Sequence, residues 1–247
     1  MLRIIFAVIV SIPSAIIFLL RAHYIKVHFN DYTEEDRYAF IKKYAVTLKN
    51  NARIETIGSG YENLPKEGGY ILYPNHQGKY DAVGIIIEHE KPCTVVMEAK
   101  RSHLPLATQL MTVLNGTRLD RSSPRAQVES FNKIIENVKS GKRYILFPEG
   151  GYNLQDFRKG INCLKEFKSG SFKCAMRSKC PVVPVALVDS WKPFGQNSLR
   201  KVTTQVHFLP PICYEEYKDM TSRELAEAVR SRIEQKIQSV AAASQES

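Results

Sequence analysis

The sequence predicts an α/β fold in a single domain with a central mixed, mostly parallel sheet flanked by helices, preceded by N-terminal hydrophobic and amphipathic helices. Short runs rich in β-branched and aromatic residues alternate with longer segments of helical periodicity. This alternation is typical of a sheet that helices cover on both faces. The length of 247 residues favours one domain that can bury a sizeable core.

The first element is an apolar stretch that favours a membrane-anchoring helix over residues 1–28. Ile4–Leu20 carries no charge and would be about 25 Å long as a helix, the short end of a bilayer crossing. A cleaved signal peptide is one alternative, but the sequence has no convincing cleavage site. A buried helix of a soluble protein is another, but it would need a large core. Pro13 could kink the helix, so shallow insertion is as compatible with the sequence as spanning. Arg21 and Lys26 after the stretch favour a cytoplasmic main domain.

The remaining elements follow in order along the chain. Residues 29–52 are predicted to hold an amphipathic helix, because apolar side chains recur at spacings of three and four along Thr33–Asn51. Residues 53–247 are predicted to form the α/β domain. Its strands are expected at Arg53–Ile57, Tyr70–Tyr73, Thr94–Met97, Tyr144–Phe147, Val182–Val188 and Val202–Phe208. Its helices are expected at Pro124–Lys139, Asn162–Ser178 and Ser222–Val240.

The composition excludes several classes of protein and points to an anionic partner. With 44% hydrophobic and 24% charged residues, the chain is neither disordered nor collagen-like nor a polytopic membrane protein. The net charge of +10 suits nucleic acid, an anionic membrane or a phosphorylated substrate. Nucleic acid is disfavoured because no zinc finger, aromatic RNP-like strand or basic zipper is present. Five cysteines without a C-x-x-C pair favour a reducing compartment.

The sharpest local signal is the segment Asn75–Asp81, which follows the apolar strand Tyr70–Tyr73. Catalytic groups in open α/β sheets lie at such strand ends. His76 and Asp81 would point about 140° apart on a regular helix, so they can meet only if the chain bends, and Gly78 allows a bend. A histidine held by an aspartate acts as a general base. The alternative is that His76 closes a loop and Asp81 caps the next helix.

Two further segments carry chemistry-bearing residues. Phe147–Gly151 ends a predicted strand with a Pro-Glu-Gly-Gly turn, which can aim backbone N–H groups into a cleft and place the Glu149 carboxylate at its rim. The alternative is an ordinary strand-terminating turn. Asn115–Arg121 carries two arginines, Arg118 and Arg121, and guanidinium forks suit pairs of phosphate oxygens.

In this order, the motifs resemble those of the glycerolipid acyltransferase family, of the bacterial 1-acyl-sn-glycerol-3-phosphate acyltransferase type. The N-H-x4-D motif of the family stands here as Asn75–Asp81, and F-P-E-G stands unaltered as Phe147–Gly150. The second family motif is similar to Asn115–Arg121, with its glycine displaced by one position. The remaining matches are F-K-x-G at Phe167–Gly170 and apolar-V-P-V at Val182–Val185.

The resemblance implies a membrane-associated enzyme that moves a fatty acyl group from acyl-CoA or acyl-carrier protein to the free hydroxyl of 1-acyl-sn-glycerol 3-phosphate, giving phosphatidic acid. His76 is expected to act as the general base and Asp81 to hold its ring. No cofactor or metal ion is expected, and the expected partners are anionic membrane lipids, a lysophospholipid acceptor and the acyl donor. The residues expected to bind substrate are Asn75, Arg118, Arg121, Glu149, Gly150 and Lys168.

One departure from the family pattern concerns the acceptor. The family often continues F-P-E-G with an arginine that helps to hold the acceptor phosphate, whereas this chain continues Gly151-Tyr152-Asn153. Arg118, which stands where an apolar residue is usual, is expected to replace part of the missing charge. The alternatives are another lysophospholipid or amphipathic acceptor and, from another class, a non-enzymatic lipid-binding protein of the membrane surface. A non-enzymatic lipid-binding protein would not explain why His76 and Asp81 occur together.

Overall fold

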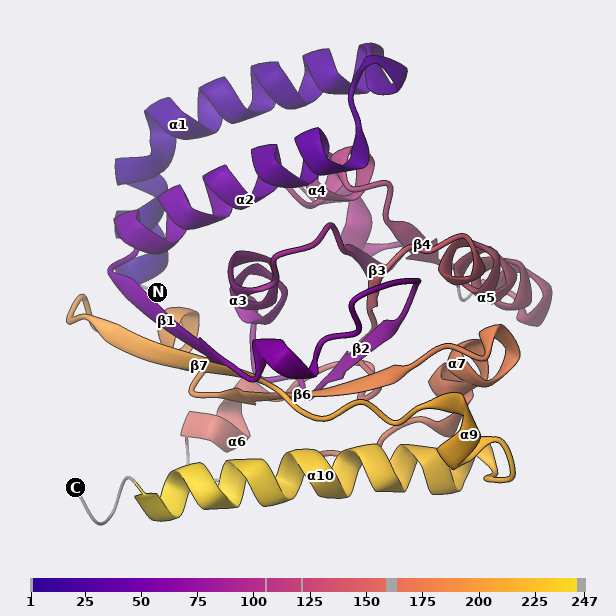
Figure 1. Ribbon diagram of the computed structural model, residues 1–247. Helices are drawn as coiled ribbons and strands as arrows, with labels where there is room; N and C mark the ends of the chain where they lie inside the picture. Colours follow the sequence, from indigo (N-terminus) through magenta and orange to yellow (C-terminus); the bar gives the residue numbers. More distant parts are fainter. Residues whose placement is uncertain (1, 105, 121, 159–163, 244–247) are drawn as a thin grey trace.

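A seven-stranded sheet forms the centre of the computed structural model, which describes residues 2–104, 106–120, 122–158 and 164–243 (Figure 1). The strand order is β1-β7-β6-β2-β5-β3-β4, and neighbouring strands are parallel except β6 and β7. The strands are β1 (Ile54–Ser59), β2 (Ile71–Pro74), β3 (Thr94–Glu98), β4 (Thr117–Leu119), β5 (Tyr144–Ile145), β6 (Val182–Val188) and β7 (Val202–Phe208). The predicted α/β fold with a mixed, mostly parallel sheet is therefore confirmed.

Helices surround this sheet and connect its parallel strands. The longer α-helices are α1 (Leu2–Val27), α2 (Glu34–Asn51), α3 (Asp81–Glu88), α4 (Ala107–Val113), α5 (Pro124–Lys139) and α10 (Ser222–Ala243). The shorter ones are α6 (Leu154–Arg158), α7 (Lys173–Ser178), α8 (Lys192–Gly195) and α9 (Tyr214–Tyr217). Short 3-10 helices are η1 (Phe29–Asp31), η2 (Tyr61–Asn63), η3 (Arg101–His103) and η4 (Ser169–Phe172).

The helix expected at Asn162–Ser178 is wrong over its first half. Asn162 itself lies outside the described residues, and the segment from Leu164 to Lys168 is not helical. The Lys168 N–H donates to the Pro148 carbonyl at 3.0 Å instead of to a carbonyl of its own segment. Helical structure starts only at η4 and continues into α7. A tertiary contact thus overrides the local helical periodicity.

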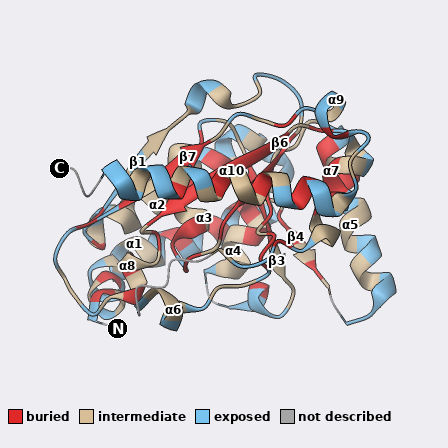
Figure 2. Cartoon of the chain, turned by 90° about the horizontal axis from the view of Figure 1, so that it is seen from below, coloured by how far each residue is buried: buried red, intermediate tan, exposed pale blue. Residues whose placement is uncertain are grey.

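Two hydrophobic cores cover the two faces of the sheet. Because side chains alternate along a strand, Ile71 and Tyr73 belong to one core, whereas Tyr70 and Leu72 belong to the other. Side chains of α5, α7 and α10 complete the first core, and those of α1, α2, α3 and α4 complete the second. Figure 1 shows α10 below the sheet and α1 to α3 above it, and Figure 2 shows the buried strands beneath the partly exposed α10.

The apolar helix α1 packs against other helices of the domain. Its buried side chains, among them Ala7, Phe18 and Ile25, face α2, α4 and α8. At its N-terminal end Arg3 is 1% exposed and donates to the Pro193 carbonyl at 3.1 Å. Figure 1 shows α1 and α2 as an antiparallel pair. Among the described helices, α1 is the one that is long and apolar enough to cross a membrane.

A buried polar cluster joins α2, β2 and the end of α3, the helix that begins at the candidate site. His89 Nε2 lies 2.7 Å from the Tyr70 hydroxyl, and His89 Nδ1 lies 2.6 Å from the Lys91 carbonyl oxygen, so Nδ1 carries the proton. The Tyr38 hydroxyl donates to the His89 carbonyl at 3.0 Å. Burial, together with nearby positive charges, lowers the pKa of His89 to about 4.

This cluster predicts acid-sensitive stability. The unfolded chain protonates His89 near pH 6.5 and the folded chain only near pH 4, so between these values the unfolded state binds more protons. The free energy of unfolding should therefore fall as the pH is lowered through this window, by up to about 3 kcal/mol for His89. Urea unfolding at several pH values measures it. His89→Gln, which cannot titrate, should show a shallower dependence, and identical slopes would contradict the assignment.

Candidate active site

Strand β2 brings His76 to the carboxyl edge of the sheet. The strand ends at Pro74, and a non-helical turn separates it from α3, which begins at Asp81. The turn brings His76 Nδ1 to 2.7 Å from Asp81 Oδ2. The Asp81 side chain is 1% exposed and that of His76 is 17% exposed, so the carboxylate is buried while part of the imidazole stays open. With Nδ1 bonded to Asp81, Nε2 is the nitrogen left to accept a substrate proton.

The carboxylate of Asp81 is held by donors from two distant parts of the chain. Oδ2 also accepts hydrogen bonds from the backbone N–H groups of Gln77 at 2.6 Å and Gly78 at 2.9 Å. Oδ1 accepts a hydrogen bond from Ser190 Oγ at 2.6 Å. Ser190 is 3% exposed and follows β6. Hydrogen bonds to an ionised carboxylate are strong and directional, so they fix the oxygen that faces His76.

Gly78 favours a close approach between two segments. A Cβ at this position would lie 3.2 Å from Trp191 Cα and 3.4 Å from the Ser190 carbonyl oxygen. Gly78 is not among the glycines with positive φ. The bend expected at Gly78 is present, but glycine serves contact with the segment after β6 and not a left-handed backbone.

Asn75 ties the ends of β2 and β6 together. Its side-chain amide donates to the Leu187 carbonyl at 3.1 Å and accepts from the Leu187 N–H at 2.7 Å. The residue is 1% exposed. The structure therefore gives Asn75 a positioning contact between strands, and its predicted contact with substrate stays a prediction.

The turn after β5 places Glu149 against the backbone of His76. Glu149 Oε1 accepts the His76 N–H at 2.7 Å, and the residue is 7% exposed. Burial raises the pKa of Glu149 to about 7, although the hydrogen bond from His76 opposes the rise. Gly150 follows with φ +70°, a left-handed conformation that favours glycine, and a Cβ there would lie 2.7 Å from Lys168 Nζ. Glu149 thus fixes the backbone of the turn that carries the histidine.

We expect Glu149→Ala to lower kcat about 10–100-fold and Glu149→Gln to lower it much less. Alanine leaves the His76 N–H without its buried acceptor, which costs about 1–3 kcal/mol. The side-chain carbonyl of glutamine can accept the same bond. Steady-state kinetics of both variants measure the difference, with the exposed Glu166→Ala as control. Equal losses in the alanine and glutamine variants would mean that the carboxyl charge or proton matters instead.

Two aromatic rings flank the imidazole of His76. The ring centroid of Phe147 lies 4.3 Å away, and that of Tyr152 lies 4.7 Å away with the planes at 72°. Burial raises the pKa of Tyr152, as does the nearby charge of Asp81, while the charge of Arg101 opposes the rise. These rings restrict the imidazole. Arg101 follows the carboxyl end of β3, which lies at the same edge of the sheet as His76.

Two lysine side chains lie at the turn at residues 148–151. Lys168 lies over Gly150, and Lys165 Nζ lies 3.5 Å from the Gly151 carbonyl oxygen. We call these two lysines, together with Arg101 after the end of β3, the basic rim. Arg121, which the sequence predicts to hold the acceptor phosphate, lies outside the described residues.

Arg118 contacts the turn that carries Arg101. It stands in β4, opposite Met97 of β3, and its Nε donates to Ser102 Oγ at 3.1 Å. Ser102 belongs to η3, which also contains Arg101. The structure therefore gives Arg118 a supporting contact behind the basic rim, and its predicted contact with an acceptor stays a prediction.

Sequence reasoning missed two residues at this edge of the sheet, Ser190 and Arg101. Each follows the carboxyl end of a strand, β6 and β3, that runs parallel with its neighbours β2 and β5. Since carboxyl ends of parallel strands share one edge, polar residues after β3 and β6 could have been included as candidates. Neither residue belongs to one of the sequence motifs described above.

The chain is similar to known acyltransferases. A family model described as Acyltransferase matches residues 56–188. The 1-acyl-sn-glycerol-3-phosphate acyltransferase of Saccharomyces cerevisiae is 33% identical over 129 residues, which are 52% of this chain and 41% of that protein. The Escherichia coli protein of the same name is 29% identical over 191 residues, 77% of this chain and 73% of that protein. The chain thus spans less than half of the yeast relative.

A solved structure has a similar fold. The crystal structure of the 1-acyl-sn-glycerophosphate (LPA) acyltransferase PlsC from Thermotoga maritima superposes with a TM-score of 0.66. The match covers 93% of this chain and 97% of that one at 19% identity. At this identity the likeness shows the fold alone.

Proposed function

The chain belongs to the acyltransferase family, and from that premise we propose that it transfers a fatty acyl group from an acyl thioester to the free hydroxyl of 1-acyl-sn-glycerol 3-phosphate, giving phosphatidic acid. The observation that carries the proposal is the imidazole of His76, which is bonded to a buried Asp81 and open at one edge. The basic rim beside it suits an acceptor that carries a phosphate.

The proposed reaction is a direct acyl transfer. The acceptor hydroxyl oxygen attacks the thioester carbonyl carbon while His76 Nε2 takes the hydroxyl proton. Asp81 stabilises the imidazolium that forms. The tetrahedral intermediate then collapses as the C–S bond breaks, and the leaving thiolate takes the proton back from His76. The Gly151 N–H makes no hydrogen bond among the described residues, and we assign it as a donor to the oxyanion.

The acceptor phosphate is proposed to bind at the basic rim together with Arg121. A phosphate monoester brings up to two negative charges, and charge-assisted hydrogen bonds are worth about 1.5–3 kcal/mol each. One observation favours a second candidate, an acceptor whose phosphate is a diester. Tyr152 packs on His76 at the place where the resembled family has an arginine, so this chain supplies one cation fewer there.

A panel of donors and acceptors tests the proposal. Full-length protein in mixed micelles is given acyl-CoA or acyl-carrier protein donors of equal chain length, with lysophosphatidate or lysophosphatidylglycerol as acceptor. Mass spectrometry of the lipid product should show that lysophosphatidate is preferred, with His76→Ala as the inactive control. Preference for the diester would establish the second candidate. If no donor and acceptor pair gave a product, the proposed enzymatic activity would be wrong and the lipid-binding alternative would remain.

We also propose that α1 attaches the protein to the cytoplasmic face of the membrane, lying in the plane of the interface. The helix is fixed along the domain from Arg3 to Ile25, so it does not project from it. Its opposite face exposes large apolar side chains at spacings of three and four. These are Ile5, Ile9, Ile12, Ile16 and Leu20. Such a helix buries its apolar face at the boundary of headgroups and acyl chains, and the basic protein adds attraction to anionic lipids.

Charged substitutions on this face test the attachment. We expect Ile9→Asp with Ile16→Asp to abolish flotation with liposomes that contain anionic lipid, while activity on a micellar acceptor is retained. Deleting α1 is a poorer test, because Phe18 belongs to the core. Gln238→Asp with Ala241→Asp on α10 adds the same charge elsewhere and should float normally. Unchanged flotation of the α1 variant would contradict the proposed contact.

A further inference from the structure

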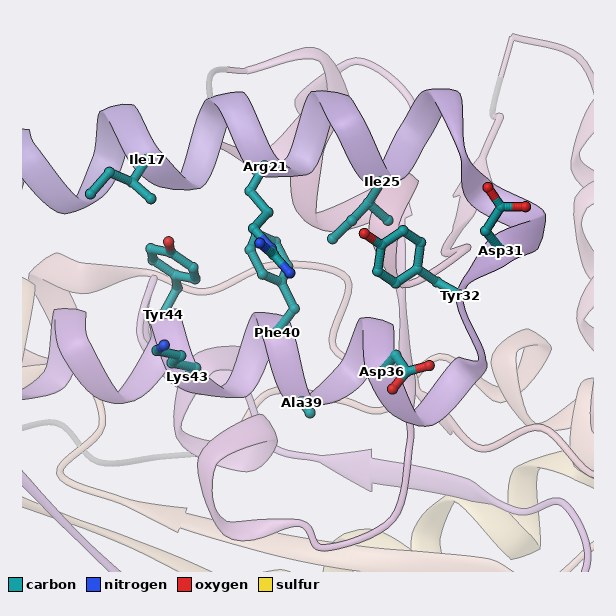
Figure 3. A pocket seen from close by; sticks show the side chains of 10 residues that line it. All are labelled: Ile17, Arg21, Ile25, Asp31, Tyr32, Asp36, Ala39, Phe40, Lys43 and Tyr44. Carbon is teal, nitrogen blue, oxygen red and sulfur yellow. The ribbon is translucent and has the colours of Figure 1, made fainter.

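A cavity of about 630 Å³ lies between α1 and α2 (Figure 3). Its floor is built by an aromatic cluster in which Phe40 stacks on Phe18 at 5.4 Å and meets Tyr44 at 4.9 Å. His76, Asp81 and the basic rim are not among its lining residues. The cavity is therefore separate from the candidate active site, and its size is that of an ordinary ligand pocket.

Two cations line this cavity without a partner in the described part of the chain. Arg21 reaches into it from α1, and Lys43 comes from α2 (Figure 3). No hydrogen bond, ion pair or ring contact engages either side chain among the described residues. By contrast, the neighbouring Arg37 donates to the carbonyls of Phe29 and Tyr32 and lies over the Phe29 ring. Both side chains are exposed and, within the described ranges, unpaired, so each is free to bind an anion that enters the cavity.

Two carboxylates line the opposite end of the same cavity. Figure 3 shows Asp31 and Asp36 there, beside the ring of Tyr32. Hydrogen bonds from Thr33 reach Asp36 Oδ2 and lower the pKa of Asp36, so this carboxylate is charged at neutral pH. Within the described residues, the partner of the Asp31 carboxylate is His28 Nδ1, at 3.3 Å. A cation held at this end would meet carboxylates and an aromatic face.

An apolar groove continues from the cavity along the outer face of α1. This groove is a shallow, open hollow of about 370 Å³ lined by Ile17, Leu20, Arg21 and Tyr24, and it shares Ile17 and Arg21 with the cavity. Ile17, Leu20 and Tyr24 are each more than half exposed. This groove lies on the helix that we place in the membrane interface, so it is positioned to receive an acyl chain.

We propose that the cavity between α1 and α2 binds the headgroup of a zwitterionic membrane phospholipid, with one acyl chain in the adjoining groove. Arg21 and Lys43 hold the phosphodiester, and the ammonium group lies at Asp31, Asp36 and Tyr32. The two cations and two carboxylates balance, which matches a headgroup with no net charge. An anionic lipid without an amine would leave the carboxylates facing its headgroup. The site is independent of acyl transfer and holds a lipid that the enzyme does not consume.

Native mass spectrometry of the full-length protein tests this site. The protein is released from detergent micelles that contain equal amounts of phosphatidylethanolamine and phosphatidylglycerol with the same acyl chains. We expect one retained phosphatidylethanolamine, in about tenfold excess over phosphatidylglycerol. Arg21→Gln with Lys43→Gln should lower its retention about tenfold or more, and Asp31→Asn should remove the preference for the amine. Lys26→Gln, on α1 but outside the lining, is the matched control and should behave as wild type.

Several outcomes would overturn the proposal. Retention that does not change in the Arg21→Gln, Lys43→Gln variant would place any bound lipid elsewhere. Equal retention of both lipids, unaffected by Asp31→Asn, would mean that the site does not select a zwitterion. Competition by glycerophosphoethanolamine at lipid-like concentrations would show that the headgroup alone is the ligand and that the groove has no part. The substituted side chains are exposed or at the rim, and thermal unfolding confirms that each variant is folded.

Discussion

Replacing His76 with alanine is expected to lower kcat for acyl transfer about 10²–10⁴-fold while the protein stays folded and membrane-bound. The substitution removes the Nε2 that takes the acceptor proton. It also leaves the network around Asp81 largely intact, because Gln77, Gly78 and Ser190 still donate to the carboxylate. The loss should therefore appear in kcat, with little change in the KM values of donor and acceptor.

The control for this variant is His23→Ala, since His23 is an exposed histidine on α1. Activity is measured at equal folded concentration, established by circular dichroism and thermal unfolding. A His76→Ala protein with near-normal turnover would remove His76 from the mechanism and would leave the acyltransferase fold without its proposed base. A lowered melting temperature would instead assign part of the loss to structure.

The second large effect is expected at Asp81. Asp81→Asn should lower kcat about 10³–10⁴-fold, because a neutral amide cannot stabilise the imidazolium of His76. An asparagine fits the same space. Its carbonyl oxygen can accept from the Gln77 and Gly78 N–H groups, and its NH₂ can donate to Ser190 Oγ. The substitution therefore separates the charge of Asp81 from its hydrogen bonds.

Asp81→Ala provides the comparison that tells the two roles apart. Alanine leaves buried donors of the turn and of Ser190 without an acceptor, so this variant should lose both activity and about 1–3 kcal/mol or more of stability. Asp81→Asn should lose activity with a much smaller change in stability, and the exposed Asp219→Asn should change neither. If Asp81→Asn kept wild-type kcat, the carboxylate would be only a structural support of the turn.

Local patterns were sufficient to predict most of the elements. Runs of β-branched residues such as Val182–Val188 became strands, and the periodic segments Pro124–Lys139 and Ser222–Val240 became helices, because these patterns reflect burial on one face or two. The prediction failed at Asn162–Ser178, where the backbone bonds to Pro148 instead of coiling. A periodicity argument cannot include such a partner, since it is distant in sequence.

The sequence by itself determined which residues hold the chemistry that lies within one turn. His76 and Asp81 are five positions apart, and the apolar stretch Ile4–Leu20 is continuous, so both could be read from neighbouring residues. Only the tertiary structure decided how they are used. It brought Ser190 to Asp81 across 109 positions, turned Arg118 toward η3, and laid α1 along α2 with a charged cavity between them. These features depend on the order of strands in the sheet and on which helix faces meet, and both are set by contacts between segments far apart in the chain.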